Sequence, residues 1–111
     1  MTETSGNGEH QWRITEADLH SHLQARMEQR GITREEIELT LNAGWAASDA
    51  KPGTEGKVFV FDYRAEWLGH FFEEKEVTVY CKVIGEAITL LTAKARYGKD
   101  FPRRDQGENR V

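Results

Sequence analysis

The sequence predicts an α+β fold in which two N-terminal helices pack on an antiparallel sheet of three to four strands. Two helix-start signals fall in the first third of the chain, and alternating apolar and polar residues dominate after residue 57. Helices followed by a run of strands are typical of a sheet that is covered on one face. A chain of 111 residues is long enough for one domain with a single modest core.

The first predicted helix spans residues 15–30. Thr15 is a good N-cap residue, and Asp18 follows at the position where an acid can complete a capping box. Gly31 tolerates positive φ and is expected to end the helix. Residues 10–14, before the cap, are expected to form a short leading strand or an extended arm. The apolar stripe of the helix recurs every fourth residue, at Leu19, Leu23 and Met27.

A second helix is predicted directly after the first. Thr33 and Glu36 form a capping box, and Ile32 precedes the cap, where it can pack on Ile37 as a hydrophobic staple. Gly44 is expected to end this helix. The two helices therefore form a helix–turn–helix unit at the start of the domain.

Strands are predicted in the second half of the chain. Residues 57–64 alternate clearly and form one strand. Residues 65–70 fit either a turn or the start of another strand, and residues 45–47 would add a short strand or cover the core.

The densest apolar and β-prone stretch is residues 75–98, which we expect to fold as a hairpin around Gly85 and Glu86. A tight turn at these two residues brings the apolar positions of both strands onto one face. The register that follows pairs Val83 with Ile88, Lys82 with Thr89, Cys81 with Leu90, Tyr80 with Leu91, Val79 with Thr92, Thr78 with Ala93 and Lys75 with Arg96.

The polar ends and the charge distribution limit the classes of function. Residues 1–9 and 102–111 are predicted to be flexible tails around a domain at 10–101. The net charge of −4 argues against indiscriminate nucleic-acid binding. Residues 1–56 carry five Lys and Arg against ten Asp and Glu, whereas residues 57–104 carry nine against seven, so a local phosphate site on the sheet stays open.

Several classes of site are not indicated by the sequence. It contains no Walker loop, GxGxxG or HExxH motif and no paired-cysteine signature, so we expect no cofactor and no metal. His20 and His22 point about 200° apart on a helix and would not share a metal ion. Cys81 has no second cysteine to pair with and is expected in the core. Without a signal peptide or a long apolar run, a cytoplasmic protein that does not enter membranes is expected.

Basic and aromatic side chains on the first helix and the hairpin form the candidate site. RNA cleavage through attack by the 2′-OH needs proton-transfer groups and cations around the phosphate, but no metal. Arginine binds phosphate through two parallel hydrogen bonds, and aromatic rings stack on unpaired bases. The candidate catalytic residues are His22, Arg30, Arg96 and Tyr97, and the candidate RNA-binding residues are Arg26, Lys75, Tyr80, Lys82 and Lys94.

A family resemblance rests on the helix–turn–helix unit. The run that contains His22, Arg26-Met27, Arg30-Gly31-Ile32-Thr33 and Glu36-Ile37 resembles the opening of the family catalogued as domain of unknown function 4258. The closing run, residues 88–98, is similar to the final strand of BrnT-type toxins. The resemblance covers roughly residues 15–98. It implies a fold akin to RelE- and BrnT-type ribonuclease toxins, which are often metal-independent ribonucleases neutralised by an antitoxin.

Two functions follow as expectations, beside the alternative of a non-enzymatic protein that binds RNA or DNA through the basic half of the sheet. The first is a small metal-independent endoribonuclease of the toxin type, with RNA as substrate and a protein antitoxin as partner. The second is a non-catalytic module of the same fold that binds a protein partner or acts as a regulator, through the Trp67–Phe72 region. The departures from the BrnT pattern are the negative net charge and the lack of a basic C-terminal helix.

Overall fold

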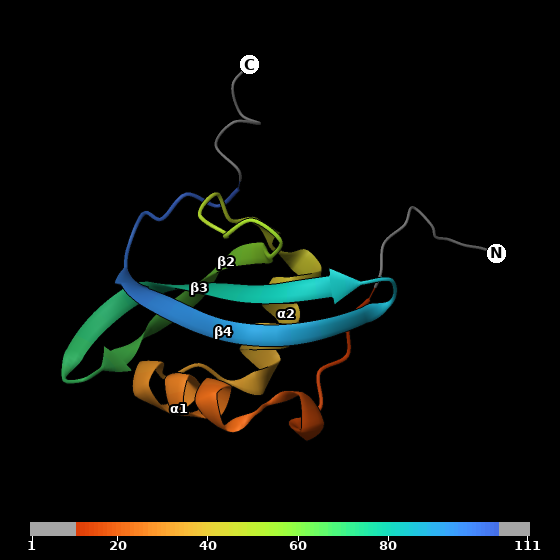
Figure 1. Cartoon of the computed structure of the whole chain (residues 1–111). Coiled ribbons are helices and arrows are strands. Elements are labelled where there is room, and N and C mark those ends of the chain that lie inside the picture. Colours follow the sequence, from red (N-terminus) through yellow and green to blue (C-terminus); the bar gives the residue numbers. More distant parts are fainter. Residues whose placement is uncertain (1–10, 105–111) are drawn as a thin grey trace, which may run out of the picture.

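The computed structural model describes residues 11–104 and contains a four-stranded antiparallel sheet with helices on one face, so the predicted α+β class is confirmed (Figure 1). The strands follow one another in the order β1-β2-β3-β4. No helix in this part of the chain is long and apolar enough to cross a membrane. The elements are a 3-10 turn η2 (Glu16–Asp18), α1 (Ser21–Arg30), α2 (Arg34–Ala43), β1 (Trp45–Ala46), β2 (Glu55–Trp67), β3 (His70–Ile84) and β4 (Ala87–Gly98).

The predicted single helix over residues 15–30 is wrong in its first turn. Thr15 and Asp18 do form a capping box, but it closes only the 3-10 turn. The chain then extends, and α1 begins after His20, whose Nδ1 accepts the Leu23 N–H. The other ring nitrogen, Nε2, lies 2.9 Å from the Leu90 carbonyl oxygen on β4. The histidine therefore caps α1 and ties it to the sheet, and a continuous helix would not allow both contacts.

The second helix matches its prediction. Thr33 accepts the Glu36 N–H while the Glu36 carboxylate accepts the Thr33 N–H, as a capping box requires. Residues 11–14 form the extended arm rather than a strand. The backbone of Trp12 makes two hydrogen bonds to the side chain of Asn42, which holds this arm along α2.

The core lies between the helices and one face of the sheet, which we call the helix face. Apolar side chains from α1 and α2 and from the turn between them meet alternate residues of β3 and β4, as the amphipathic patterns require. The buried cluster consists of Ile14, Leu19, Leu23, Ile32, Ile37, Leu41, Val77, Val79, Cys81, Leu90 and Ala93.

The first hairpin is longer than predicted. β2 extends beyond the predicted 57–64 at both ends, and the ambiguous residues 65–70 contain the end of β2, the turn and the start of β3. The turn places Leu68 at φ 53° and Gly69 at φ 86°, which is the left-handed geometry of a tight hairpin. Residues 45–46 pair with β2 as a short strand.

The second hairpin has the predicted turn, but its register changes halfway. Val83 faces Ile88 and Cys81 faces Leu90, as predicted. A β-bulge then inserts Leu91, and every later pair is shifted by one residue. The observed pairs are Tyr80 with Thr92, Val79 with Ala93, Thr78 with Lys94, Glu76 with Arg96 and Lys75 with Tyr97.

The sheet's second face, which we call the open face, carries no helix from residues 11–104. The loop after β1 and the segment after β4 approach each other over it (Figure 1). Within that segment, Arg103 donates to the Val60 carbonyl oxygen and to the carboxylates of Asp62 and Glu74. The tail predicted to begin at residue 102 is therefore packed on the sheet through residue 104, while residues 1–10 and 105–111 lie outside the described part.

Candidate functional site

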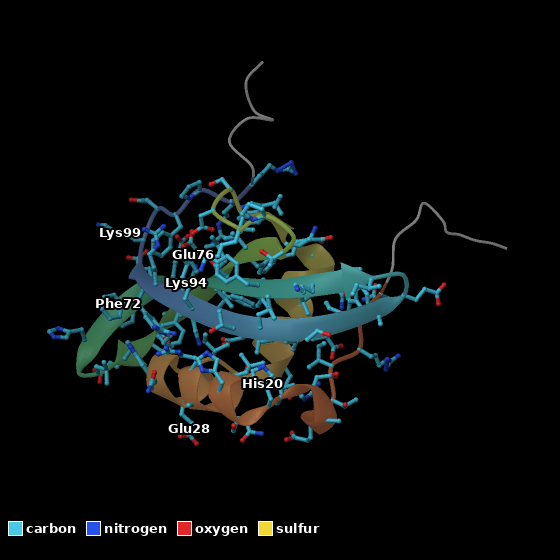
Figure 2. All side chains as sticks on the ribbon, viewed as in Figure 1. His20, Glu28, Phe72, Glu76, Lys94 and Lys99 are labelled. Carbon is cyan, nitrogen blue, oxygen red and sulfur yellow. The ribbon has the colours of Figure 1, made fainter. Side chains whose placement is uncertain are left out.

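The sheet separates the predicted site residues into two groups. α1 packs beside β4 on the helix face, and it carries His22, Arg26 and Arg30. The bulge at Leu91 turns Lys94 and Arg96 to the open face, because it places Ala93, Ala95 and Tyr97 on the helix face instead. Figure 2 shows Glu76 and Lys94 on one side of β3 and β4 and His20 on the other, beside α1. The predicted set of nine residues thus does not converge in one cleft.

The α1 residues are engaged in local or structural contacts. Arg30 donates to the Ala93 carbonyl oxygen at 3.2 Å, which fixes the end of α1 against β4. Arg26 donates to Gln29 on its own helix. His22 is exposed and stacks on His20, with 6.1 Å between ring centroids. None of the three lines the pocket that contains Lys94 and Arg96 of β4.

Tyr97 has a structural position rather than the predicted catalytic one. Its hydroxyl donates to the Arg30 carbonyl oxygen, and its ring stacks on Trp67 at 5.0 Å. Burial, with smaller effects of the nearby Tyr63 and Glu36, raises the pKa of Tyr97. A partly buried hydroxyl that already donates to a backbone oxygen is not available to exchange a proton with a substrate.

Lys75 was predicted to bind RNA, and its burial contradicts this. Only 2% of the residue is exposed, on the helix face. Its ammonium group donates to Glu36 at 2.7 Å and to the Gly31 carbonyl oxygen, and it lies over the Tyr97 ring. A cation enclosed in this way cannot reach a phosphate in solvent.

The remaining predicted residues gather on the open face. Tyr80 and Lys82 alternate with the core residues of β3, and Lys94 and Arg96 project from the neighbouring strand β4. Lys82 is exposed at the far end of this row.

A pocket of about 570 Å³ lies on this face between the loop after β1 and the C-terminal segment; we call it the open-face pocket. Three cationic side chains and two carboxylates line it, together with one tryptophan and two hydroxyl groups. Its lining residues are Trp45, Ala46, Ala47, Ser48, Asp49, Val58, Glu76, Thr78, Lys94, Arg96, Pro102 and Arg104.

Glu76 and Arg96 face each other across β3 and β4 in this pocket. The Arg96 Nε lies 2.8 Å from one carboxylate oxygen and a terminal nitrogen lies 3.2 Å from the other. The Glu76 side chain is 13% exposed and that of Arg96 is 62% exposed. The two-point contact with Glu76 raises the pKa of Arg96 and holds its guanidinium at the pocket surface. The exposed part of the Arg96 side chain is therefore accessible to an anion.

A second polar cluster joins the loop to the same face. The Tyr80 hydroxyl donates to Asp49 at 2.8 Å, and the Lys94 ammonium lies 3.1 Å from the same carboxylate. These hydrogen bonds, from Tyr80 first and then Lys94, lower the pKa of Asp49. Burial raises the pKa of Tyr80, and hydrogen bonds to Tyr80 and Asp49 raise that of Lys94. Both Tyr80 and Lys94 therefore hold their protons at neutral pH.

Four pocket residues with a charged or aromatic side chain were not among the predicted site residues: Trp45, Asp49, Glu76 and Arg104. Glu76 had a detectable signal, because it alternates with Val77 and so shares a face with Tyr80 and Lys82. Asp49 and Arg104 lie outside regular strands, and only the folded chain brings them to this face.

Comparisons with known proteins add no assignment. No family model, no curated protein and no solved structure matches this chain. Within residues 11–104, no group of three or more histidine, cysteine, aspartate or glutamate side chains is arranged to hold a metal ion.

Proposed function

We propose that this protein is a small endoribonuclease that binds and cleaves RNA in the open-face pocket by attack of the 2′-OH. The observation that carries the proposal is that Lys94, Arg96 and Arg104 line one pocket of the sheet together with Glu76, whose carboxylate Arg96 contacts. This retains the reaction expected from the sequence, but it moves the site away from α1 and replaces most of its residues.

The pocket offers each group that the reaction needs. The 2′ oxygen attacks phosphorus, the bond from phosphorus to the 5′ oxygen breaks, and a 2′,3′-cyclic phosphate and a 5′-hydroxyl result. Glu76 accepts the proton of the 2′-OH. Arg96 and Arg104 stabilise the charge that develops on the phosphate oxygens. The 5′ oxygen takes its proton from Lys94, which lines the pocket and is protonated at neutral pH.

Product analysis of a single-stranded RNA incubated with the full chain in EDTA tests this proposal. We expect fragments that end in a 2′,3′-cyclic phosphate. Glu76→Gln should lower the cleavage rate at least about 100-fold, since general-base catalysis contributes about 10²–10⁴-fold. Glu86→Gln is the matched control, because Glu86 is exposed at the β3–β4 turn outside the pocket. Absence of cleavage, or equal rates in the two variants, would contradict the proposal.

The second candidate is the non-catalytic module that binds a protein partner, such as an antitoxin. The tip of the β2–β3 hairpin favours it, because Leu68 and Phe71 are 78% and 61% exposed. A leucine at φ 53° occupies a conformation that asparagine or glycine adopts more easily.

The two candidates are separated by co-purification with the product of a neighbouring gene. Leu68→Asn combined with Phe71→Thr should abolish a complex formed through the tip. Ile84→Thr is the control, since Ile84 is equally apolar and 76% exposed at the other turn. A complex that survives the tip variant would argue against this interface.

A further inference from the structure

A second hollow adjoins the open-face pocket at the edge of the sheet. It has a volume of about 370 Å³, and we call it the edge pocket. It shares Trp45 and Arg104 with the open-face pocket, so the two hollows meet at these side chains. Its lining residues are Ala43, Gly44, Trp45, Phe59, Arg103 and Arg104.

Among residues 11–104, Phe59 supplies the one aromatic ring in contact with the shared tryptophan. Trp45 belongs to β1 and pairs with Val58, and its ring lies 5.9 Å from that of Phe59 at an angle of 43°. Gly44, before Trp45, packs closely against β2, because an added Cβ there would lie 2.4 Å from the Val58 carbonyl oxygen. An aromatic ring between two hollows is a stacking surface for a nucleotide base.

The two arginines at this junction differ in their partners. Arg103 is neutralised by Asp62 and Glu74, and it anchors the C-terminal segment to the sheet. Arg104 forms no ion pair with any of residues 11–104, although it lines both hollows. Among residues 11–104, no carboxylate has to leave the Arg104 guanidinium before it binds a phosphate, whereas Asp62 and Glu74 already occupy that of Arg103.

We propose that the open-face pocket and the edge pocket are adjacent nucleotide subsites, and that Arg104 binds the phosphate that joins two nucleotides of a single-stranded RNA. This inference rests on the proposed function and adds to it the minimal substrate, a dinucleotide. Each volume lies within the ~300–1,000 Å³ range of small-ligand pockets. One nucleotide contacts Lys94 and Arg96, and its neighbour passes Trp45 towards Phe59.

Binding of uncleavable probes to the full chain tests the inference. Calorimetry would compare 2′-O-methyl adenosine 3′-monophosphate with a 2′-O-methylated adenosine–uridine dinucleotide, and we expect the dinucleotide to bind at least about tenfold more tightly. Arg104→Ala should weaken the binding of both probes, because both carry the phosphate that Arg104 binds, whereas Lys82→Ala should leave both affinities unchanged. Lys82 is a suitable control because it is an exposed cation of the open face outside both pockets.

The three tryptophans supply an independent readout. The indole N–H resonance of Trp45, assigned with Trp45→Phe, should shift when the dinucleotide binds. Those of Trp12, on the arm along α2, and Trp67, stacked on Tyr97, should not shift.

The outcomes separate this inference from the proposed function. Equal affinities for the two probes, with the Trp45 resonance shifted, would overturn the two-subsite inference and leave the proposed function standing. Failure of the chain to bind either probe would contradict both.

Discussion

The ammonium of Lys75 lies 2.7 Å from the Glu36 carboxylate, and this ion pair joins the middle of β3 to the first turn of α2. Glu36 also closes the capping box of α2, so one carboxylate serves two contacts. Lys75 further donates to the Gly31 carbonyl oxygen in the turn between the helices. The Arg30-Gly31-Ile32 run that resembles a family motif thus has a clear structural role here: it docks the helices on the sheet.

Removal of one partner from this buried pair should destabilise the fold strongly. Lys75→Ala leaves the Glu36 carboxylate without its cation, and we expect a loss of about 3–5 kcal/mol in the free energy of unfolding. Urea unfolding followed by circular dichroism measures it. The matched control is Lys82→Ala, an exposed position at which a change within about 0.5 kcal/mol is expected. A loss below about 1 kcal/mol for Lys75→Ala would show that the pair does not hold the helices.

Gly31 should be more sensitive to substitution than another glycine with positive φ. An added Cβ at Gly31 (φ 69°) would lie 2.5 Å from the Trp67 ring, whereas at Gly53 (φ 85°) it would meet nothing within 4 Å. Both alanine variants carry the cost of the left-handed backbone, about 1 kcal/mol. Gly31→Ala should lose at least about 1 kcal/mol more in the same urea experiment, because the stacked Trp67 has to move. Equal losses in the free energy of unfolding for Gly31→Ala and Gly53→Ala would mean that Trp67 does not pack against the turn.

Attachment of the C-terminal segment should depend on pH through Glu74. Hydrogen bonds from Arg103 first, and then from the Phe101 N–H at 2.9 Å, lower the pKa of this carboxyl. The stabilisation that the Glu74 carboxylate contributes is therefore complete above the unfolded-state pKa of about 4.3. It is lost as the pH falls through the lower pKa of the folded state.

The amide resonance of Phe101 reports this titration. We expect it to move with a midpoint below that of an ordinary glutamate, and to lose this transition in Glu74→Gln. A midpoint at or above the ordinary value would contradict the contact.

The fold class and part of the sheet register could be predicted from the sequence, because they depend on local signals at particular residues. The capping box at Thr33 and the turn at Gly85 are local signals, and both elements formed where expected. The bulge at Leu91 was missed, although its signal is present. Apolar residues occupy positions 88 and 90 and then 93 and 95, so the alternation changes phase after two consecutive leucines.

The candidate site was harder to predict, because its parts are distant in the chain. The missed phase change assigned Lys94 and Arg96 to the same face as the core residues of β3, and so to the side on which the helices pack. Their true neighbours, Asp49 and Arg104, are brought by a loop and by the segment after β4. No periodic pattern encodes such long-range contacts.

The most direct test of the open-face site is the RNA cleavage rate of Arg96→Ala measured beside that of His22→Ala. Arg96 lines the pocket, whereas His22 is exposed on α1 across the sheet. We predict that Arg96→Ala lowers the rate at least about 100-fold, since loss of one charge-stabilising group costs about 10²–10³-fold, and that His22→Ala cleaves like the unchanged chain. If His22→Ala no longer cleaved RNA while Arg96→Ala cleaved at the unchanged rate, the chemistry would lie on the helix face and the account would be contradicted.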